Sequence, residues 1–240
     1  MADFFISDLH LQPGRTDLAN AFYRFTREQL KPDDSLYILG DFFDAWIGDD
    51  EDEDFYLTVK KHITDTTSNG NPICFIHGNR DFLLGSRFVN ETGIKLLSEP
   101  YPLKLHNDNV LLLHGDSLCT DDIEYMQFRR QVRDPQWQQQ ILSLPLHQRR
   151  LMAAELRAKS KSMTSNKAAD IMDVNQQEVK KLFLEYNVSK IIHGHTHRPK
   201  RHKIESGEQN LERIVLGDWD KNGWFLKVVD GEYDLINFPI

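Results

Sequence analysis

The sequence predicts an α/β fold that is interrupted by a helical insertion. Short apolar runs alternate with segments of helical periodicity over most of the chain, which is the pattern of strands and helices in an α/β domain. From residue 121 to about residue 170 the pattern is helical only, and strand patterns resume at Ser189. A chain of 240 residues is long enough for one large domain with an insertion. We therefore predict a single domain over residues 1–240, with a helical cap inserted at 121–170.

Composition and charge narrow the functional class. An apolar content of 40% is ordinary for a soluble globular protein, and the formal net charge of −8 argues against a general nucleic-acid binder. No apolar run approaches the roughly 18 residues of a transmembrane helix, and we expect the N-terminus to form a strand and not a signal peptide. The two cysteines, Cys74 and Cys119, are predicted to be reduced thiols in a cytosolic protein.

The first half of the chain is predicted to alternate strands and helices. The expected strands follow the apolar runs, at 3–7, 36–39, 73–76, and the hairpin arms 103–105 and 110–113. The expected helices are 16–30, a segment that ends near 68, and 87–92. Thr16 is a candidate N-cap for the first of these helices, and Gly93 is predicted to end the third.

Six acidic residues in a row, 49–54, precede the second predicted helix. Carboxylates favour the first turn of a helix, so a solvated helix start is the interpretation we favour. A metal site is the alternative, but contiguous carboxylates fan out and do not converge on one ion.

The second half of the chain begins with the helical cap. Its helical pattern is interrupted near Pro135 and Pro145, and Asp121 with Glu124 resembles a capping box at its start. A further helix is predicted to start at 173–176. Three short runs separated by glycine turns predict antiparallel strands near the C-terminus, at 215–216, 224–229 and 233–238.

Polar residues follow five of the apolar runs at the point where each predicted strand ends. The clearest case is Asp41, which follows Tyr37-Ile38-Leu39-Gly40. A lone Gly-Asp pair is usually a turn, but five strands that each deliver an oxygen or an imidazole to one sheet edge predict a site. The candidate ligands at these strand ends are Asp8, His10, Asp41, Asn79, His114, His195 and His197.

These seven side chains predict a site for two metal ions. Carboxylate, amide and imidazole ligands without thiolate suit Mn²⁺, Fe²⁺ or Zn²⁺ and fit Ca²⁺ poorly. Seven ligands are too many for one ion, so we expect Asp41 to bridge two. One ion would take Asp8, His10 and His197, and the other would take Asn79, His114 and His195. Two ions about 3.5–4 Å apart hold a phosphoryl group and generate a hydroxide for in-line attack.

The remaining histidines carry weaker signals. His77 and His193 lie in apolar runs just before a glycine, so we expect them to be core or supporting histidines and not ligands. The other four have no such setting and are assigned no role, namely His62, His106, His147 and His202.

Five short motifs that contain the candidate ligands follow one another in a fixed order. They are Asp8-x-His10, Gly40-Asp41-x-x-Asp44, Gly78-Asn79-x-Asp81, His114-Gly115-Asp116 and Gly194-His195-x-His197. This order, which spans residues 8–197, resembles the calcineurin-type metallophosphoesterase family. The resemblance implies a four-layer α/β/β/α sandwich with a dinuclear site, and catalytic roles for Asp41, Asn79 and His114.

One position departs from the pattern of that family. Many members have a histidine after Gly-Asn, where it can protonate an alkoxide leaving group, but this sequence has Arg80. Arginine cannot give up its proton, although it can stabilise charge on a phosphoryl oxygen. We therefore predict a catalytic Arg80 and a leaving group that needs no proton, such as the phosphate released from a pyrophosphate. A surface salt bridge is the weaker alternative for this residue.

Four further stretches are similar to the pyrophosphohydrolases of lipid A biosynthesis within that family, at 44–50, 77–84, 116–122 and 171–175. The similarity implies Mn²⁺-dependent hydrolysis of UDP-2,3-diacylglucosamine at its α-phosphorus, which gives UMP and 2,3-diacylglucosamine 1-phosphate. It also implies substrate contacts at Asn79, Arg80, Asp122, Ser160, Thr164, Lys167 and His195. At Thr164 a hydroxyl can bond a phosphate or a sugar, but an amide would do equally well.

The predicted cap is basic although the whole chain is acidic. Residues 123–169 hold nine basic and three acidic side chains, and Arg149 and Arg150 are expected to face outward. A basic helical cap suggests peripheral attachment to the cytoplasmic face of a bacterial inner membrane, with a solvated helix face as the alternative. The apolar cap residues, such as Trp137, would either line an acyl pocket or pack the cap on the body. No obligate protein partner is inferred.

Two other functions remain open on the same residues. A soluble nucleotide pyrophosphatase or phosphodiesterase would use the same core, but the basic, apolar cap disfavours it. A metal-free binding scaffold would be expected to lack several ligands, and none of the seven is missing. A micellar lipid assay and a metal analysis separate these alternatives.

Overall fold

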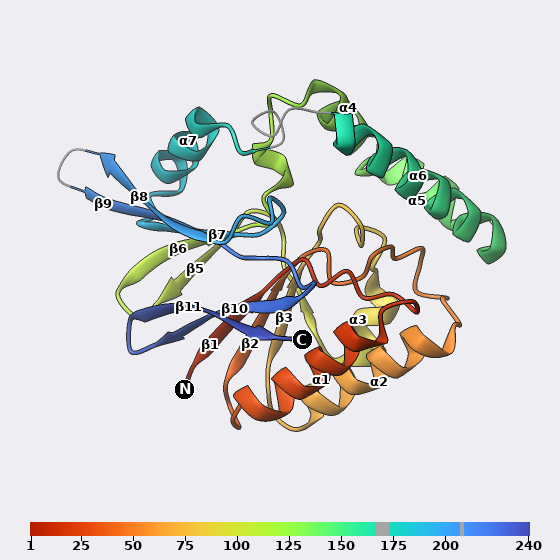
Figure 1. Cartoon of the computed structure of the whole chain (residues 1–240), viewed down its shortest axis with the longest axis horizontal. Helices are drawn as coiled ribbons and strands as arrows, with labels where there is room; N and C mark the ends of the chain where they lie inside the picture. The colour runs from red at the N-terminus through yellow and green to blue at the C-terminus, as the bar shows by residue number, and fades with distance from the viewer. Residues whose placement is uncertain (167–172, 207–208) are drawn as a thin grey trace.

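The computed structural model describes residues 1–166, 173–206 and 209–240 and contains two β-sheets that pack face to face (Figure 1). The strand order is β11-β10-β1-β2-β3-β4 in the first sheet and β5-β6-β7-β9-β8 in the second. The first sheet consists of β1 (Asp3–Ile6), β2 (Ser35–Leu39), β3 (Ile73–Ile76), β4 (Lys95–Leu96), β10 (Asn222–Val229) and β11 (Glu232–Pro239). The second consists of β5 (Tyr101–Leu105), β6 (Asp108–Leu112), β7 (Lys190–His193), β8 (Lys200–Ser206) and β9 (Gln209–Val215).

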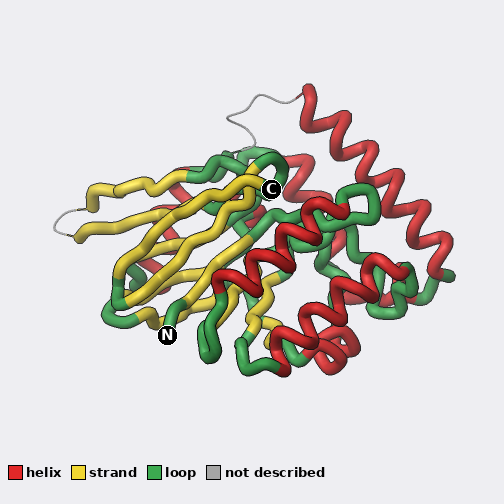
Figure 2. The backbone as a smooth tube through the Cα atoms, turned by 60° about the horizontal axis from the view of Figure 1, so that its bottom comes forward, coloured by secondary structure: helices red, strands yellow, loops and turns green. Residues whose placement is uncertain are grey.

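Helices cover the outer face of each sheet. The helices α1 (Thr16–Gln29), α2 (Asp54–Ser68) and α3 (Ser86–Thr92) lie on the first sheet, and α7 (Gln176–Tyr186) lies on the second (Figures 1 and 2). The order of the layers is therefore helix, sheet, sheet, helix. This arrangement confirms the predicted α/β fold and its four-layer sandwich.

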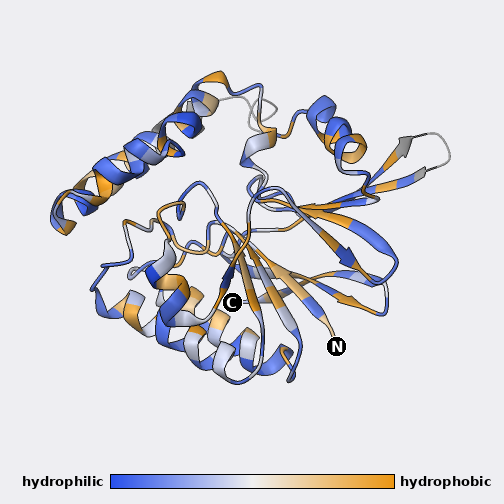
Figure 3. Cartoon of the chain, turned by 180° about the vertical axis from the view of Figure 1, so that it is seen from behind, coloured by the Kyte–Doolittle hydropathy of each residue, from blue (hydrophilic) through white to orange (hydrophobic). Residues whose placement is uncertain are grey.

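Alternating side chains along the buried strands explain why the layers form. In β1, Phe4 and Ile6 pack against α1–α3, whereas Phe5 points between the sheets and joins the same core as Leu112 of β6. Leu111, which precedes Leu112 in β6, points to the opposite face of the sheet and packs with residues of α7. Successive residues of a strand point to opposite faces, so a strand that is covered on both sides needs a continuous apolar run. Figure 3 shows this hydrophobic content along the strands.

Parallel pairing brings the ends of the strands together. The neighbours β1, β2 and β3 are parallel in the first sheet, and β6, β7 and β9 are parallel in the second. Parallel strands end at the same edge of a sheet, and α/β folds place their sites outside these carboxyl ends. The two sheets therefore present two sets of loops to the same region of the molecule.

Two predicted helix caps need correction, and one edge strand was missed. Arg15, and not Thr16, occupies the N-cap position of α1, without a side-chain hydrogen bond. The first helix of the cap, which begins at Ile123, is capped by Asp122 and not by Asp121. The strand β8 was not predicted, because most of its residues are polar, and it lies at the edge of its sheet.

Three helices fill most of the predicted cap. They are α4 (Ile123–Val132), α5 (Pro135–Leu142) and α6 (Leu146–Asn166), with the predicted breaks near Pro135 and Pro145. Figure 1 shows them beside the four layers, over the loops that follow β2 and β3. Within the described parts of the chain, no helix has the length and apolarity needed to cross a membrane.

The acidic run attaches this cap to the body. Arg149 of α6 is only 3% exposed and bonds Asp50, and Arg150 forms an ion pair with the buried Glu51. The expectation that these arginines face outward is therefore wrong for Arg149, whereas Arg150 is exposed and pairs with the acidic run at the surface. Asp49 lies on the other side of the run, where its carboxylate accepts hydrogen bonds from backbone N–H groups at the start of α3. A solvated helix start describes only the last three residues of the run, which are exposed.

Candidate metal centre

The seven predicted ligands lie just beyond the carboxyl ends of five strands from both sheets. They are Asp8 and His10 after β1, Asp41 after β2, Asn79 after β3, His114 after β6, and His195 and His197 after β7. Backbone contacts join these loops: the Asp8 N–H donates to the Gly40 carbonyl at 3.1 Å, and the Gly194 N–H donates to the His114 carbonyl at 2.8 Å. The sandwich therefore brings residues from position 8 to position 197 into one place.

The backbone at the site is unusual. Among the described non-glycine residues, nine have a positive φ, and five of these are predicted ligands with φ between 51° and 66°. The five are Asp8, His10, Asp41, His195 and His197. A side chain in this left-handed region carries a conformational cost, and such residues cluster at functional sites. The cost is offset here by the packing of the surrounding loops.

Two glycines allow the loops after β2 and β3 to approach each other. Gly40 has φ +82°, and a Cβ atom at this position would lie 2.5 Å from the Cα of Gly78. A Cβ on Gly78 would lie 2.2 Å from Oδ1 of Asp41. The same carboxylate oxygen accepts a hydrogen bond from the Arg80 N–H at 2.9 Å. Both glycines are therefore required for the observed position of the Asp41 carboxylate.

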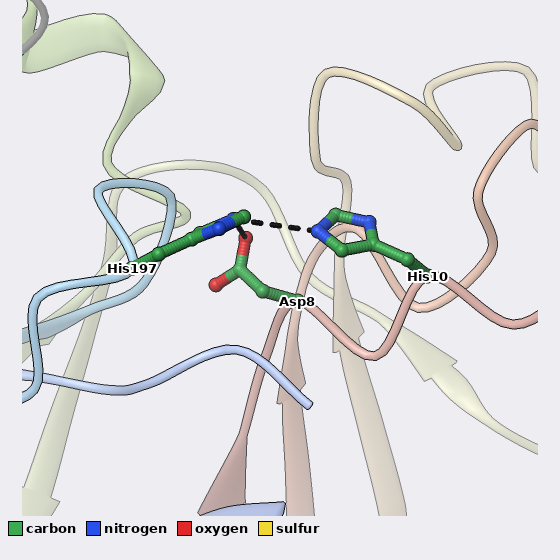
Figure 4. Close-up of side chains that lie close together, drawn as sticks. All are labelled: Asp8, His10 and His197. Carbon is green, nitrogen blue, oxygen red and sulfur yellow. Dashed lines mark hydrogen bonds and ion pairs between the residues drawn. The ribbon is translucent and has the colours of Figure 1, made fainter. Parts of the chain in front are cut away.

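Asp8, His10 and His197 form the first half of the centre (Figure 4). The Nε2 atoms of the two histidines lie 3.3 Å apart, and Nε2 of His197 is also 3.3 Å from Oδ1 of Asp8. Ser7 and the backbone of His195 orient the aspartate, because both donate to its Oδ2 atom, at 2.6 and 2.9 Å. Three ligand atoms therefore converge from the loops after β1 and β7.

The donor atoms of this half fit a divalent cation. Oδ1 of Asp8 and Nδ1 of His10 are buried and make no well-formed hydrogen bond among the described residues, since the nearest charged neighbour of Oδ1 is the His197 ring at 3.3 Å. Burying a carboxylate oxygen without a partner is costly, and a bound cation would remove that cost. Oxygen and imidazole donors are also the set that first-row divalent ions prefer.

Asn79, His114 and His195 form the second half. Oδ1 of Asn79 lies 3.0 Å from Nε2 of His114 and 3.0 Å from Nδ1 of His195. The other nitrogen of His114, Nδ1, contacts the Leu39 carbonyl at 2.8 Å, which fixes the ring and directs Nε2 into the site. This support is typical of a histidine that binds metal.

Asp41 lies between the two halves. Its Oδ1 atom is 3.6 Å from Nε2 of His114, and its Oδ2 atom is 3.9 Å from Nδ1 of His10. Asp8 also belongs to both groups of possible ligand atoms, since it clusters with Asp41 and His114 as well. The geometry is compatible with the predicted bridging carboxylate, and the assignment of each ligand to an ion stays a prediction.

The pKa shifts of these residues favour a bound cation. Burial opposes the charged form of His114, but Asp41 and Asp8 outweigh it and raise the pKa of this imidazole to about 9. Burial lowers the pKa of His195 to about 3, and the nearby His114 lowers it further. Burial also raises the pKa of Asp41 above its usual range. The carboxylates thus draw a proton onto His114 where a metal ion could supply the positive charge instead.

Arg80 lies beside Asp41 and is fixed by two carboxylates. Its Nε atom is 3.2 Å from Oδ2 of Asp41, and its Nη1 atom donates to Oδ1 of Asp44 at 2.6 Å. Arg157 of α6 reaches the same Asp44 through two hydrogen bonds, at 2.9 and 3.1 Å. Arg80 is only 19% exposed and faces the ligands, so the alternative of a surface salt bridge does not describe it.

Two histidines that were not predicted to be ligands support the loops instead. Nε2 of His77 contacts the Leu84 carbonyl at 2.7 Å, and the buried His193 contacts the Gly194 carbonyl through Nδ1. Asp81 has a similar role, because its two oxygens accept from the N–H groups of Gly78 and Phe42. Burial raises the pKa of Asp81 to about 7, with a further contribution from Asp41.

A cavity of about 490 Å³ connects the centre with the cap. Its polar end includes Asn79 and Arg80, and it extends between α4, α5 and α6. Its apolar lining includes Trp46, Phe82, Phe128, Trp137, Ile141 and Met152. Ligand pockets are typically apolar clefts of this size with a few polar groups. The cavity could therefore hold an apolar chain whose polar end lies at the metal centre.

Some of the predicted substrate contacts line this cavity, and others lie outside the described residues. Asp122 and Ser160 line the same cavity as Asn79 and Arg80, and Asp122 also caps α4. His195 lies in the metal centre. The side chain of Thr164 and the whole of Lys167 lie outside the described residues.

Sequence reasoning missed two residues of the site. Arg157 entered only as one of nine basic cap residues, and Tyr125 was not considered. In the structure Arg157 pairs with Asp44, and the ring of Tyr125 lies 5.8 Å from that of His195. No local signal marks either residue, because their partners lie in distant parts of the chain.

Comparison with known proteins gives independent information. A family model described as calcineurin-like phosphoesterase matches residues 4–199. A Cellvibrio japonicus (strain Ueda107) protein named UDP-2,3-diacylglucosamine hydrolase is 49% identical over 226 residues, which cover 94% of each chain. A Salmonella paratyphi B protein of the same name is 45% identical over 240 residues, which cover 100% of each chain.

The fold also has a counterpart among solved structures. An archaeal phosphodiesterase superposes with a TM-score of 0.51 at 13% identity, and the match covers 99% of this chain and 100% of that chain. At this level of identity the likeness shows the fold alone.

Proposed function

Since this chain belongs to the calcineurin-like phosphoesterase family, we propose that it hydrolyses the pyrophosphate bond of UDP-2,3-diacylglucosamine. The products would be UMP and 2,3-diacylglucosamine 1-phosphate, in the biosynthesis of lipid A. The observation that carries the proposal is the cavity that begins at Asn79 and Arg80 and continues into the apolar interior of the cap. A substrate with a pyrophosphate at one end and acyl chains at the other matches both parts.

The metal centre would hold two Mn²⁺ ions in this proposal. Asp8, His10 and His197 would bind one ion, Asn79, His114 and His195 the other, and Asp41 both. Two such ions, when bound, neutralise phosphoryl charge and activate water for in-line attack. The orphaned buried atoms of Asp8 and His10 support a metal in the first half.

Arg80 would stabilise the charge that develops on the leaving phosphate. Its contacts with Asp41 and Asp44 hold the guanidinium in place before the substrate arrives. A phosphate ester has a second pKa near 6, so the leaving group departs without a proton. This chemistry explains why an arginine can stand where many family members have a proton-donating histidine.

The reaction can be tested with isotopically labelled water. The protein is incubated with Mn²⁺ and UDP-2,3-diacylglucosamine in ¹⁸O-water, and both products are analysed by mass spectrometry. Attack at the α-phosphorus places the label in UMP, whereas attack at the β-phosphorus places it in the lipid phosphate. Equal turnover of water-soluble nucleotide sugars would instead indicate a general nucleotide pyrophosphatase and would overturn the proposed substrate.

We also propose that the protein attaches reversibly to the cytoplasmic face of a bacterial inner membrane. The arginines first considered for this role are engaged elsewhere, because Arg149 and Arg150 pair with the acidic run. The support comes instead from exposed apolar side chains of the cap, where Ile123 is 62% and Leu151 is 64% exposed. Such side chains can insert at the boundary between headgroups and acyl chains.

A further inference from the structure

A network of buried charges joins the cap helix α4 to the metal centre. Glu99, which precedes β5, accepts a hydrogen bond from the His114 N–H at 2.8 Å. Arg129 of α4 donates from Nη2 to Glu99 at 3.1 Å and from Nε to Asp116 at 2.8 Å. One guanidinium therefore bridges two carboxylates that flank a predicted ligand.

Burial makes this bridge important. The side chain of Asp116 is fully buried and that of Glu99 is 11% exposed, so water cannot solvate their charges well. Buried carboxylates are tolerated when a cation and hydrogen bonds compensate them. The Tyr125 hydroxyl adds a bond of 2.7 Å to Asp116, but a neutral hydroxyl cannot replace the charge of Arg129. Arg133 also lies 4.0 Å from Asp116, but Arg129 contacts both carboxylates, so its loss would increase their repulsion next to His114.

The orientation of His114 depends on its backbone. Its ring is held at Nδ1 by the Leu39 carbonyl, and its backbone N–H is held by Glu99. These two contacts direct Nε2 to within 3.0 Å of Oδ1 of Asn79. A shift of Glu99 would therefore move the imidazole away from the second half of the centre.

We propose that Arg129 is a positioning residue, which holds Glu99 and Asp116 in place and thereby fixes His114 for metal binding. Because Arg129 belongs to α4, the seating of the cap and the geometry of the centre are linked. Substrate that fills the cavity beside α4 would favour the arrangement in which the metal ligands are correctly placed. The inference rests on the proposed metal centre and reaction, and its test therefore measures metal affinity separately from turnover.

The test uses three variants of the full chain and one matched control. Arg129→Met removes the charge and keeps much of the side-chain volume, and Arg129→Lys keeps the charge but not the two-pronged contact. Arg129→Met combined with Glu99→Gln removes one carboxylate as well, while the glutamine oxygen can still accept from the His114 N–H. The control is Arg130→Met, at the neighbouring exposed position of α4.

Calorimetric titration with Mn²⁺ should show tenfold or greater loss of affinity in Arg129→Met, and turnover should fall with it. Arg129→Lys should lie between this variant and the unmodified protein. The double variant should recover most of the affinity, because the side chain that accepts from the His114 N–H then carries no charge and is no longer repelled by Asp116. Arg130→Met should behave as the unmodified protein. If Arg129→Met alone fails to fold, the Mn²⁺ affinity of the double variant still tests the inference.

Two results would overturn the inference. If Arg129→Met unfolds at a lower temperature but binds Mn²⁺ as tightly as the unmodified protein, Arg129 contributes to stability only. If the double variant binds Mn²⁺ no better than Arg129→Met, Glu99 is not the connection to His114. The Mn²⁺ affinities remain informative if the unmodified protein does not cleave the diacylated nucleotide sugar, so a failure of the proposed function is distinguishable.

Discussion

The Nε2 atoms of His10 and His197 lie 3.3 Å apart, although 187 residues separate the two histidines in the sequence. Each also faces a carboxylate, since His197 is 3.3 Å from Asp8 and His10 is 3.9 Å from Asp41. Both histidines have left-handed backbone conformations, with φ of 51° and 55°. The left-handed backbone of these two residues has a conformational cost, and it directs both imidazoles to the same point. A bound cation would stabilise this arrangement.

The first prediction concerns removal of the metal. A ligand that binds only the folded state at 100 times its dissociation constant adds about 2.7 kcal/mol to the free energy of unfolding. Thermal unfolding of chelator-treated protein should therefore shift upward as Mn²⁺ is added. His197→Ala should show a smaller shift, because one donor is missing. An unfolding midpoint that is independent of Mn²⁺ would contradict a metal centre.

The second prediction concerns the residue between the two halves. Asp41→Ala should lose both metal ions and more activity than the replacement of any other ligand, because this carboxylate lies between both groups of donors. Metal content is measured by mass spectrometry after dialysis against Mn²⁺. Asp52→Ala is a matched control, since this aspartate is 74% exposed and lies in the acidic run. Two tightly bound ions in Asp41→Ala would show that Asp41 does not bridge.

The third prediction concerns the charge of Arg80. Arg80→His should lower kcat for pyrophosphate cleavage by about 100-fold, because a neutral imidazole lacks the fixed positive charge with which the guanidinium would stabilise the leaving phosphate. Arg87→His, at an exposed position of α3, should leave kcat unchanged. The measurement is steady-state turnover of UDP-2,3-diacylglucosamine in detergent micelles. Full activity of Arg80→His on this substrate would show that Arg80 does not act on the phosphates.

The fourth prediction concerns membrane attachment. Replacing Ile123 and Leu151 by serine should weaken sedimentation with anionic vesicles, since about 25 cal/mol is lost for each Å² of apolar surface that no longer inserts. Leu184→Ser is the control, because Leu184 is 74% exposed but lies on α7, on the second sheet. Turnover in micelles should stay the same for Leu184→Ser. Equal vesicle binding by both variants would argue against attachment through the cap.

The fifth prediction concerns stability at acidic pH. His62 of α2 packs against α1, where its Nε2 atom contacts the Thr26 hydroxyl at 2.7 Å and its ring centroid lies 4.4 Å from that of Tyr23. Burial lowers the pKa of His62, and the nearby Arg27 lowers it further. The unfolded chain therefore binds a proton more readily, so the free energy of unfolding should fall as the pH drops below about 6.5.

Urea unfolding between pH 8 and pH 5 measures this effect. The variant His62→Gln keeps a hydrogen-bonding group beside Thr26 but cannot titrate, so its stability should fall less over the same range. An identical pH dependence in the two proteins would show that the pKa of His62 is the same in the folded and the unfolded chain, and would contradict the prediction.

Whereas the four layers were implied by the family resemblance, the sequence by itself determined the alternating strands and helices of the fold and the set of candidate ligands. Both depend on information that is local in the chain. A buried strand such as β3 (Ile73–Ile76) needs an uninterrupted apolar run. A polar residue just beyond such a strand, such as Asp41 after β2, lies at the edge of the sheet because the strand ends there. The order of the five motifs needed no knowledge of distant contacts, and the family comparison agrees with it.

Only the tertiary structure decided how charged residues in the cap are used. Arg149 was expected to face solvent, but it is buried against Asp50, and Arg129 bridges Glu99 and Asp116. An arginine has the same local signature whether it meets water or a carboxylate, because a long, flexible side chain finds its partner through space and not along the chain. The pairing of helix α6 with the acidic run, and with it the shape of the cavity, follows from the packing of segments that lie about 100 residues apart.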